Sequence, residues 1–141
     1  MKRTIKMLAV MALALPVLYF GSASEAGAFC IHNWTDTEIA VKQVHGGTSI
    51  PFKGFSKTIK AGEKACCNWR THDCNTKGKE HAKVKFDVWY FFPLGKGADQ
   101  SGNVDACTDF EIKANGRLVV HGSIEKLMSG DGSSGLVCKR E

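Results

Sequence analysis

Histidine and serine side chains are the residues of this chain that could carry out nucleophilic chemistry, but few have the spacing that it needs. His72 directly precedes Asp73. His121 stands two residues before Ser123, so His121 and Ser123 would lie on the same face of a strand. A hydrolase with a dispersed site around His72 or His121 is therefore one hypothesis. The chain has no G-x-S-x-G nucleophile elbow and no H-E-x-x-H zinc motif. Exposed polar strand positions explain these residues equally well, and we predict no catalytic site.

Six cysteines form the second group of chemically capable residues: Cys30, Cys66, Cys67, Cys74, Cys107 and Cys138. An even number in a small exported chain predicts a disulfide framework. Cys66 and Cys67 would be strained if bonded to each other, so each is expected to pair elsewhere. On a strand their side chains point to opposite faces, which allows them to join two different neighbours. Cys30 and Cys138, near the two ends of the exported part, are candidate partners for them.

Two groups of residues have side chains that suit a metal. A zinc set would consist of Cys66, Cys67, His72 and Cys74. A calcium set would consist of Asp99, Asn103 and Asp105. The zinc set lacks the CxxC spacing of zinc knuckles, and the calcium set lacks the order and the bidentate Glu of an EF-hand loop. We therefore predict disulfides at the cysteines, a solvated loop around Asp99, and no metal or cofactor.

The first 28 residues have the three parts of a secretory signal peptide. Basic residues at positions 2–6 precede an apolar run over 7–20, and the small residues Ala26-Gly27-Ala28 follow as an A-x-A-like cleavage site. A membrane anchor is the alternative, but the run falls short of the roughly 20 residues needed to span a bilayer, and Pro16 interrupts it. No second long apolar run follows. The sequence thus predicts cleavage after Ala28, no transmembrane span afterwards, and a secreted or periplasmic protein.

Length and composition limit what the exported part can be. The chain has 141 residues, of which 43% are hydrophobic and 23% charged, and its formal net charge is +5. These fractions exclude a wholly disordered chain, and the absence of a heptad pattern excludes a coiled coil. Residues 29–141 are expected to form a single secreted domain.

Short alternating segments separated by turns predict an all-β domain. The strand candidates are 29–34, 38–44, 55–60, 64–69, 82–92, 107–113, 117–123 and 136–139. In the strongest of them, Val84, Phe86, Val88 and Tyr90 share one face at a period of two residues. About eight short strands with frequent turns favour a small disulfide-stapled β-sandwich or barrel.

Three further segments complete this prediction. Asn115-Gly116 between two alternating runs indicates a β-hairpin, because tight primed turns need positive φ. Ile124–Met128 is expected to form one helical turn, and 93–103 a long loop. The triplet Asn33-Trp34-Thr35 is formally a glycosylation sequon, which we interpret as a strand end followed by a turn.

A basic segment is the most informative feature of the charge distribution. Its nine cations are Lys53, Lys57, Lys60, Lys64, Arg70, Lys77, Lys79, Lys83 and Lys85. Only three acidic residues lie in the same stretch. Such a segment on an exported protein suits an anionic envelope polymer, an acidic glycan or a lipid surface, whereas nucleic acid is poorly matched to this compartment. The alternative is that these lysines solvate strand edges and discourage edge pairing.

Three aromatic residues lie near these charges. Trp69 precedes Arg70, while Trp89 and Phe91 share a strand face with Lys83 and Lys85. Because large aromatics mostly serve packing, we expect Trp89 and Phe91 to be core residues. If their face is exposed instead, the rings beside the cations would form a contact patch for sugars or lipid.

The leading functional hypothesis is an exported, non-enzymatic binding or structural protein of the cell envelope or exterior. It would contact an anionic surface component through the basic segment. A membrane-active protein of cytolysin or antimicrobial type is the first alternative, and a small secreted hydrolase is the second.

Overall fold

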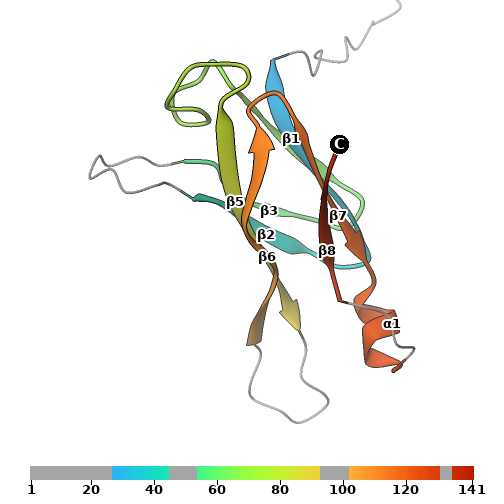
Figure 1. The fold of residues 1–141 in the computed structure, drawn as a ribbon. Helices are drawn as coiled ribbons and strands as arrows, with labels where there is room; N and C mark the ends of the chain where they lie inside the picture. Colours follow the sequence, from blue (N-terminus) through green and yellow to red (C-terminus); the bar gives the residue numbers. More distant parts are fainter. Residues whose placement is uncertain (1–26, 45–53, 93–101, 131–134) are drawn as a thin grey trace, which may run out of the picture.

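The computed structural model describes residues 27–44, 54–92, 102–130 and 135–141 (Figure 1). Most of the predicted signal peptide, residues 1–26, lies outside these ranges. Within them the chain forms eight strands and one short helix: β1 (Ala28–Thr35), β2 (Ile39–Val44), β3 (Ser56–Ile59), β4 (Lys64–Asn68), β5 (Lys83–Phe92), β6 (Gly102–Lys113), β7 (Arg117–Gly122), α1 (Ile124–Met128) and β8 (Val137–Arg140).

The strands form two four-stranded sheets that pack face to face. Sheet A has the order β4-β1-β7-β8, and sheet B has the order β3-β2-β5-β6. Neighbouring strands are antiparallel except β1 and β7, which run parallel. Each sheet has one apolar face that must be covered, and the two faces cover each other. The prediction of an all-β fold is confirmed. Of the two predicted architectures, a sandwich or a barrel, the structure is a sandwich.

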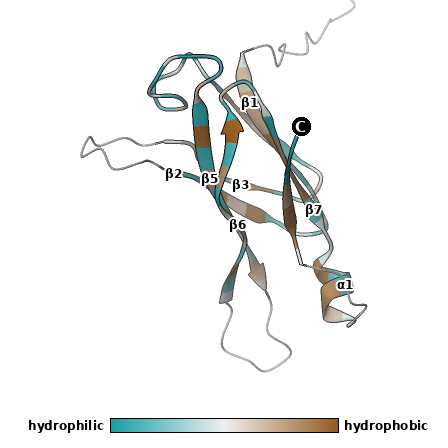
Figure 2. Ribbon diagram, in the orientation of Figure 1, coloured by the Kyte–Doolittle hydropathy of each residue, from teal (hydrophilic) through white to brown (hydrophobic). Residues whose placement is uncertain are grey.

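The core lies between the sheets and follows the alternation of the sequence. Phe86 of β5 is fully buried and meets Phe29 of β1, with ring centroids 5.0 Å apart. Phe55, which precedes β3, meets the same Phe29 ring at 5.3 Å. Figure 2 shows the matching change between hydrophobic and hydrophilic residues along β5. Burying each such ring stabilises the fold by about 1.5–3 kcal/mol.

The two sheets are connected covalently at both edges of the sandwich. At one edge the chain passes from β3 to β4 through residues 60–63, where Gly62 has a φ of +75°. This turn is bonded to β1, since Gly62 N donates to Asn33 O at 2.8 Å and Asn33 N donates to Glu63 O at 2.9 Å. At the other edge, the disulfide Cys107–Cys138 joins β6 to β8.

All six cysteines are paired, as the sequence predicts. Cys30 and Cys66 lie directly opposite each other on β1 and β4 and form one disulfide. Cys67 bonds to Cys74 in the following loop. The two neighbouring cysteines therefore do join different partners. Cys30 is one of the predicted partners, but the pairing of Cys138 with Cys66 or Cys67 is wrong, because β8 lies at the opposite edge of sheet A from β4.

Two details of the sequence prediction are corrected. Asn115-Gly116 does reverse the chain, with Gly116 N donating to Lys113 O at 2.8 Å, but β6 and β7 belong to different sheets and form no hairpin ladder. The predicted loop over 93–103 also ends earlier, because β6 begins at Gly102, opposite Phe92. The rest of that loop lies outside the described residues.

Candidate functional site

The basic segment of the sequence is distributed over several elements. Lys53 lies outside the described residues, and the others occupy β3 (Lys57), the β3–β4 turn (Lys60), β4 (Lys64), the loop 69–82 (Arg70, Lys77, Lys79) and β5 (Lys83, Lys85). The fold therefore does not gather the whole set on one surface. Strand edges and turns receive most of these cations.

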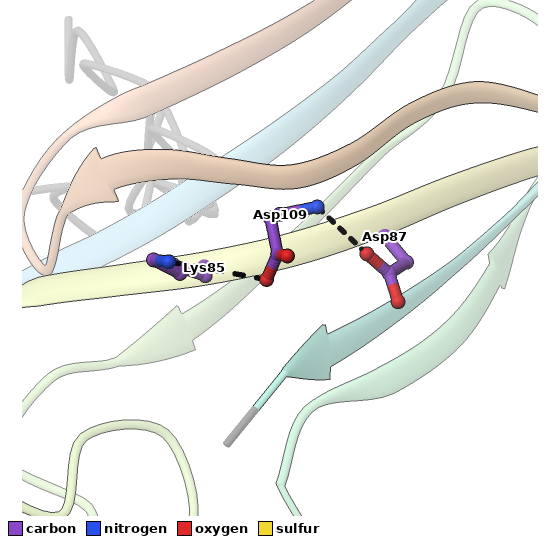
Figure 3. Close-up of polar contacts among 3 residues, drawn as sticks. All are labelled: Lys85, Asp87 and Asp109. Carbon is purple, nitrogen blue, oxygen red and sulfur yellow. Dashed lines mark hydrogen bonds and ion pairs between the residues drawn. The ribbon is translucent and has the colours of Figure 1, made fainter. Parts of the chain in front are cut away.

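The two lysines of β5 lie beside acidic residues of β6. Lys83 Nζ is 3.0 Å from Glu111 Oε1, and Lys85 Nζ is 3.9 Å from Asp109 Oδ1. Asp109 N also donates to Asp87 Oδ1 at 2.8 Å, so the three charged residues form a chain across the two strands (Figure 3). The hydrogen bond from Lys83 holds the pKa of Glu111 below its ordinary value of 4.5. Much of the positive charge on this face is thus balanced locally.

The three candidate aromatics have different surroundings. Trp69 is half-buried against the core, and the Arg70 guanidinium lies 5.1 Å from its ring centroid. Trp89 and Phe91 lie on the outer face of sheet B, where Trp89 is half-buried and Phe91 is 56% exposed. The prediction that this pair belongs to the core is wrong, because their inward-pointing neighbours Val88 and Tyr90 already fill the space between the sheets.

The loop 69–82 is fixed rather than loosely attached. Besides the Cys67–Cys74 bond, the buried amide of Gln43 donates to Cys74 O at 2.9 Å. Asn75 is also buried, and its side chain donates to Lys79 O at 2.8 Å and accepts from Lys77 N at 3.2 Å. The backbone that carries Lys77 and Lys79 is therefore held in place, although both residues are exposed.

Four cationic residues converge on a depression at the β6–β8 edge of the sandwich, next to the turn 114–116. The depression has a volume of about 350 Å³ and is lined by Lys83, Glu111, Ile112, Lys113, Gly116, Arg117, Arg140 and Glu141. Arg117 Nη1 is 3.4 Å from Glu141 Oε2, and the Arg140 guanidinium lies 5.5 Å from the Phe110 ring centroid. Four cationic side chains face two carboxylate side chains, which leaves an excess of positive charge.

Only Lys83 of this depression belongs to the predicted basic segment. Lys113, Arg117 and Arg140 come from a part of the sequence that is acidic on balance, so linear charge could not reveal them. One feature of the sequence does indicate that two of them lie close together, because Lys113 and Arg117 flank the predicted Asn115-Gly116 turn on both sides.

A second unpredicted group lies on the outer face of sheet A. Trp34 is 52% exposed, and its ring centroid lies 5.1 Å from that of His121 and 6.3 Å from that of His32. Trp34 and His121 are register partners on β1 and β7, and Val137 of β8 continues the same row. The strand alternation contains a signal for this group, because successive side chains of a strand point to opposite faces. Phe29 and Ile31 point inward, so His32 and Trp34 lie on the outer face.

The three residues considered for hydrolysis lie in different surroundings. The Ser123 hydroxyl donates to Asp36 Oδ2 at 2.5 Å and accepts from Lys126 N at 3.2 Å, as the N-cap of α1. His121 is the ring that contacts Trp34, and His72 is exposed in the loop 69–82. The serine proton is therefore directed at a carboxylate and not at a histidine.

Of the two metal hypotheses, the geometry contradicts the zinc set, whereas the calcium set lies only partly within the described residues. The thiols of Cys66, Cys67 and Cys74 are consumed in disulfides, so they are not zinc ligands. Asn103 and Asp105 lie on β6, opposite Phe91 and Trp89, while Asp99 lies outside the described residues. Among the residues that the structure describes, no group of three His, Cys, Asp or Glu side chains could hold a metal ion.

Two further findings concern the class of protein. In the described part of the chain no helix has the length and apolar character to cross a membrane. Known protein families and curated proteins give no match to this chain. The class is therefore defined by the fold itself, an all-β sandwich with three disulfides.

Proposed function

We propose that this protein is an exported, non-enzymatic binding protein that holds an anionic component of the cell envelope or exterior in the depression at the β6–β8 edge. The observation that carries the proposal is the convergence of Lys83, Lys113, Arg117 and Arg140 on one hollow. Arginine favours such a role because its planar guanidinium forms paired hydrogen bonds with carboxylate, sulfate and phosphate groups.

The surroundings of the hollow support binding of an anion there. Glu111 forms an ion pair with Lys83 and also feels the charge of Arg140, and Glu141 forms an ion pair with Arg117, so two carboxylate side chains face four cationic ones. Lys113 and Arg140 then supply the charge that an incoming anion would neutralise. A partly enclosed surface screens such an interaction less than open solvent does.

Export is supported by two independent features. The leader over residues 1–28 has the grammar of a signal peptide, and the three disulfides are typical of an oxidising compartment. An envelope polymer, an acidic glycan or a lipid headgroup is therefore a better match than nucleic acid, which shares the charge but not the compartment.

A paired set of variants tests the depression. Binding of labelled dextran sulfate to the oxidised protein would be measured at about 10 mM and about 150 mM ionic strength. We expect the double variant Lys113→Gln/Arg140→Gln to weaken binding by about tenfold or more at the lower salt, with a flatter salt dependence. The double variant Lys77→Gln/Lys79→Gln removes the same charge from the loop 69–82 and should retain most of the affinity. Equal losses in both would show attraction to net charge, and the depression would lose its role.

Membrane activity is the second candidate, favoured by the exposure of Phe91 and Val104 near the same end of the β5–β6 ladder. It predicts sedimentation with phosphatidylglycerol vesicles but not with phosphatidylcholine vesicles, together with release of an entrapped dye. Phe91→Ala should then reduce dye release. Vesicle binding without release would indicate docking, and absence of vesicle binding would exclude this candidate.

A further inference from the structure

The row formed by Trp34, His121 and Val137 presents two aromatic rings and an aliphatic side chain on three neighbouring strands. Trp34 is 52% exposed and Val137 is 41% exposed, while His121 is half-buried between them. Isolated exposed apolar residues need no explanation, but this row is contiguous across β1, β7 and β8. It is therefore a candidate contact surface.

Trp34 is held in a defined orientation. The ring of His121 stands at 83° to the indole plane and that of His32 at 88°, so both approach it nearly perpendicularly. The residues before and after it, Asn33 and Thr35, are buried and hydrogen-bonded to each other. An aromatic side chain that is already ordered loses little entropy when it binds a ligand.

Strands β7 and β8 lie side by side (Figure 1) and carry residues of both surfaces, His121 and Val137 of the row and Arg117 and Arg140 of the depression. On β7, Arg117 and His121 point to the same outer face and are four residues apart, which corresponds to about 13 Å along a strand. Arg117 also lines the depression, so it belongs to both surfaces. Between the two ends, Lys139 of β8 lies beside Val119 on this face and is exposed.

The charges along this path are positive on balance. Lys139 lies in the middle, Arg117 and Arg140 lie at the end with the depression, and Lys64 lies beside His32 on the other side. Two acidic residues, Glu111 and Glu141, line the depression at that end, and each forms an ion pair, Glu111 with Lys83 and Glu141 with Arg117. An aromatic platform at one end and cations along the rest suit a chain that carries both sugar rings and negative charges.

We propose that a linear acidic polysaccharide lies along β7 and β8, with one sugar ring on Trp34 and its anionic groups at Lys139 and in the depression. The face of an indole carries negative charge density, which attracts the C–H bonds of a pyranose ring. This inference rests on the proposed function, because the depression supplies the anionic end of the site. It adds the ligand class and the second contact point.

Three polymers separate the two contributions. Polygalacturonate carries sugar rings and carboxylates, inorganic polyphosphate carries charge without rings, and dextran carries rings without charge. Dissociation constants would be measured with the intact, oxidised protein for each. We expect Trp34→Ala to weaken polygalacturonate binding by about tenfold and to leave polyphosphate binding unchanged. Lys113→Gln/Arg140→Gln should weaken the binding of both anionic polymers.

Two matched variants guard against trivial effects. Met128→Ala removes an apolar side chain of similar exposure from α1 and should change neither affinity, whereas Trp34→Phe retains a stacking ring and should preserve most polygalacturonate binding. If Trp34→Ala, folded to the same melting temperature, binds polygalacturonate like the wild type, the polysaccharide proposal is overturned while the anion site stands. If the wild type binds neither anionic polymer, both proposals fail. Binding of anionic vesicles that requires Trp34, with no polygalacturonate binding, would overturn the polysaccharide in favour of lipid.

Discussion

The hydroxyl of Thr35 donates to the side-chain oxygen of Asn33 at 2.6 Å, and Asn33 is entirely buried. The amide of the same asparagine donates to Thr37 O at 2.7 Å and to Ile59 O at 2.9 Å. Asn33 thereby ties the end of β1 to the turn before β2 and to the end of β3. The triplet that resembles a glycosylation sequon is thus a structural clamp, with Trp34 as its outward-facing member.

Replacing Asn33 by Ala should therefore destabilise the protein strongly. The change removes the amide donor from Ile59 O and the acceptor from Thr35 N, and each buried unsatisfied group costs about 1–3 kcal/mol. Thr37 O also loses the Asn33 amide but still accepts from the Thr35 hydroxyl at 3.0 Å. We expect a loss of about 3 kcal/mol or more in the free energy of unfolding, measured by urea denaturation. Trp34→Ala, one residue away but exposed, should cost less than about 1 kcal/mol. Comparable losses for the two variants would show that the clamp contributes little.

The strands were predictable because alternation is a local property. The pattern of β5 is visible in the sequence as Val84, Phe86, Val88 and Tyr90, and the structure buries these four residues. The choice of neighbouring strand is not local. Asn115-Gly116 specifies that the chain turns, but whether the next strand joins the same sheet depends on which inner face remains uncovered, and this is decided by the whole sandwich.

The candidate site was less predictable for the same reason. The basic segment is continuous in sequence, yet Lys85 is paired with Asp109 and Lys83 with Glu111, both from a later segment. The depression combines Lys83 with three cations that lie 30 to 57 residues further along, at Lys113, Arg117 and Arg140. A count of charges along the chain cannot show which of them meet across two sheets.

The link between Asp36 and α1 predicts a pH dependence of stability. Partial desolvation raises the pKa of Asp36, but hydrogen bonds from the Ser123 hydroxyl and from the Ile124 and Glu125 amides outweigh it, so the pKa lies below the ordinary value of 3.8. A carboxyl whose pKa is depressed by folding stabilises the protein above the unfolded-state pKa, and this contribution is lost as the pH falls through the folded-state value.

Asp36→Asn should therefore lower the melting temperature at pH 7, and the gap from the wild type should narrow below about pH 4. At neutral pH we expect a loss of about 0.5–1 kcal/mol, since the carboxylate is exposed. Ser123→Ala, which removes the N-cap, should cost about 1 kcal/mol. Thermal unfolding followed by circular dichroism between pH 7 and pH 2 measures both; a gap that stays constant with pH would contradict the role of the Asp36 charge.

The disulfides should differ in their effect on stability. Cys107 and Cys138 are separated by 31 residues, whereas Cys67 and Cys74 are separated by 7. Because a longer closed loop restricts the unfolded chain more, Cys107→Ala/Cys138→Ala should lower the free energy of unfolding by about 3–4 kcal/mol and Cys67→Ala/Cys74→Ala by about 2 kcal/mol. Urea denaturation of the two double variants tests this order. A larger loss for the Cys67–Cys74 variant would mean that this disulfide stabilises the protein mainly through contacts that it maintains in the folded state, and not through the entropy of the unfolded chain.

The ability of Cys107 to reach Cys138 depends on an irregularity in β6. Phe110 and Cys107 both point into the sandwich although they are three residues apart, which strict alternation forbids. One extra residue between them, opposite Asp87, makes this possible, and the register shifts between Phe86 and Val88 accordingly. Asp109 is the bulge residue with a φ of +50°, in the left-handed region, and it is bonded to Lys85 and Asp87 (Figure 3).

The positive φ of Asp109 predicts that Ala and Gly substitutions rank in opposite order of stability at Asp109 and at the adjacent Thr108. Asp109→Ala keeps a side chain in the left-handed region and loses the contact with Lys85, so it should destabilise the protein by about 1 kcal/mol, whereas Asp109→Gly should stay within about 0.5 kcal/mol of the wild type. At Thr108, which has no positive φ, Gly should instead be worse than Ala by about 0.5–1 kcal/mol. Urea denaturation of the four variants gives the ranking. If Gly is the worse substitution at both positions, backbone strain at Asp109 does not limit the bulge, and the positioning of Cys107 must depend on the side-chain contacts of Asp109 and Asp87 instead.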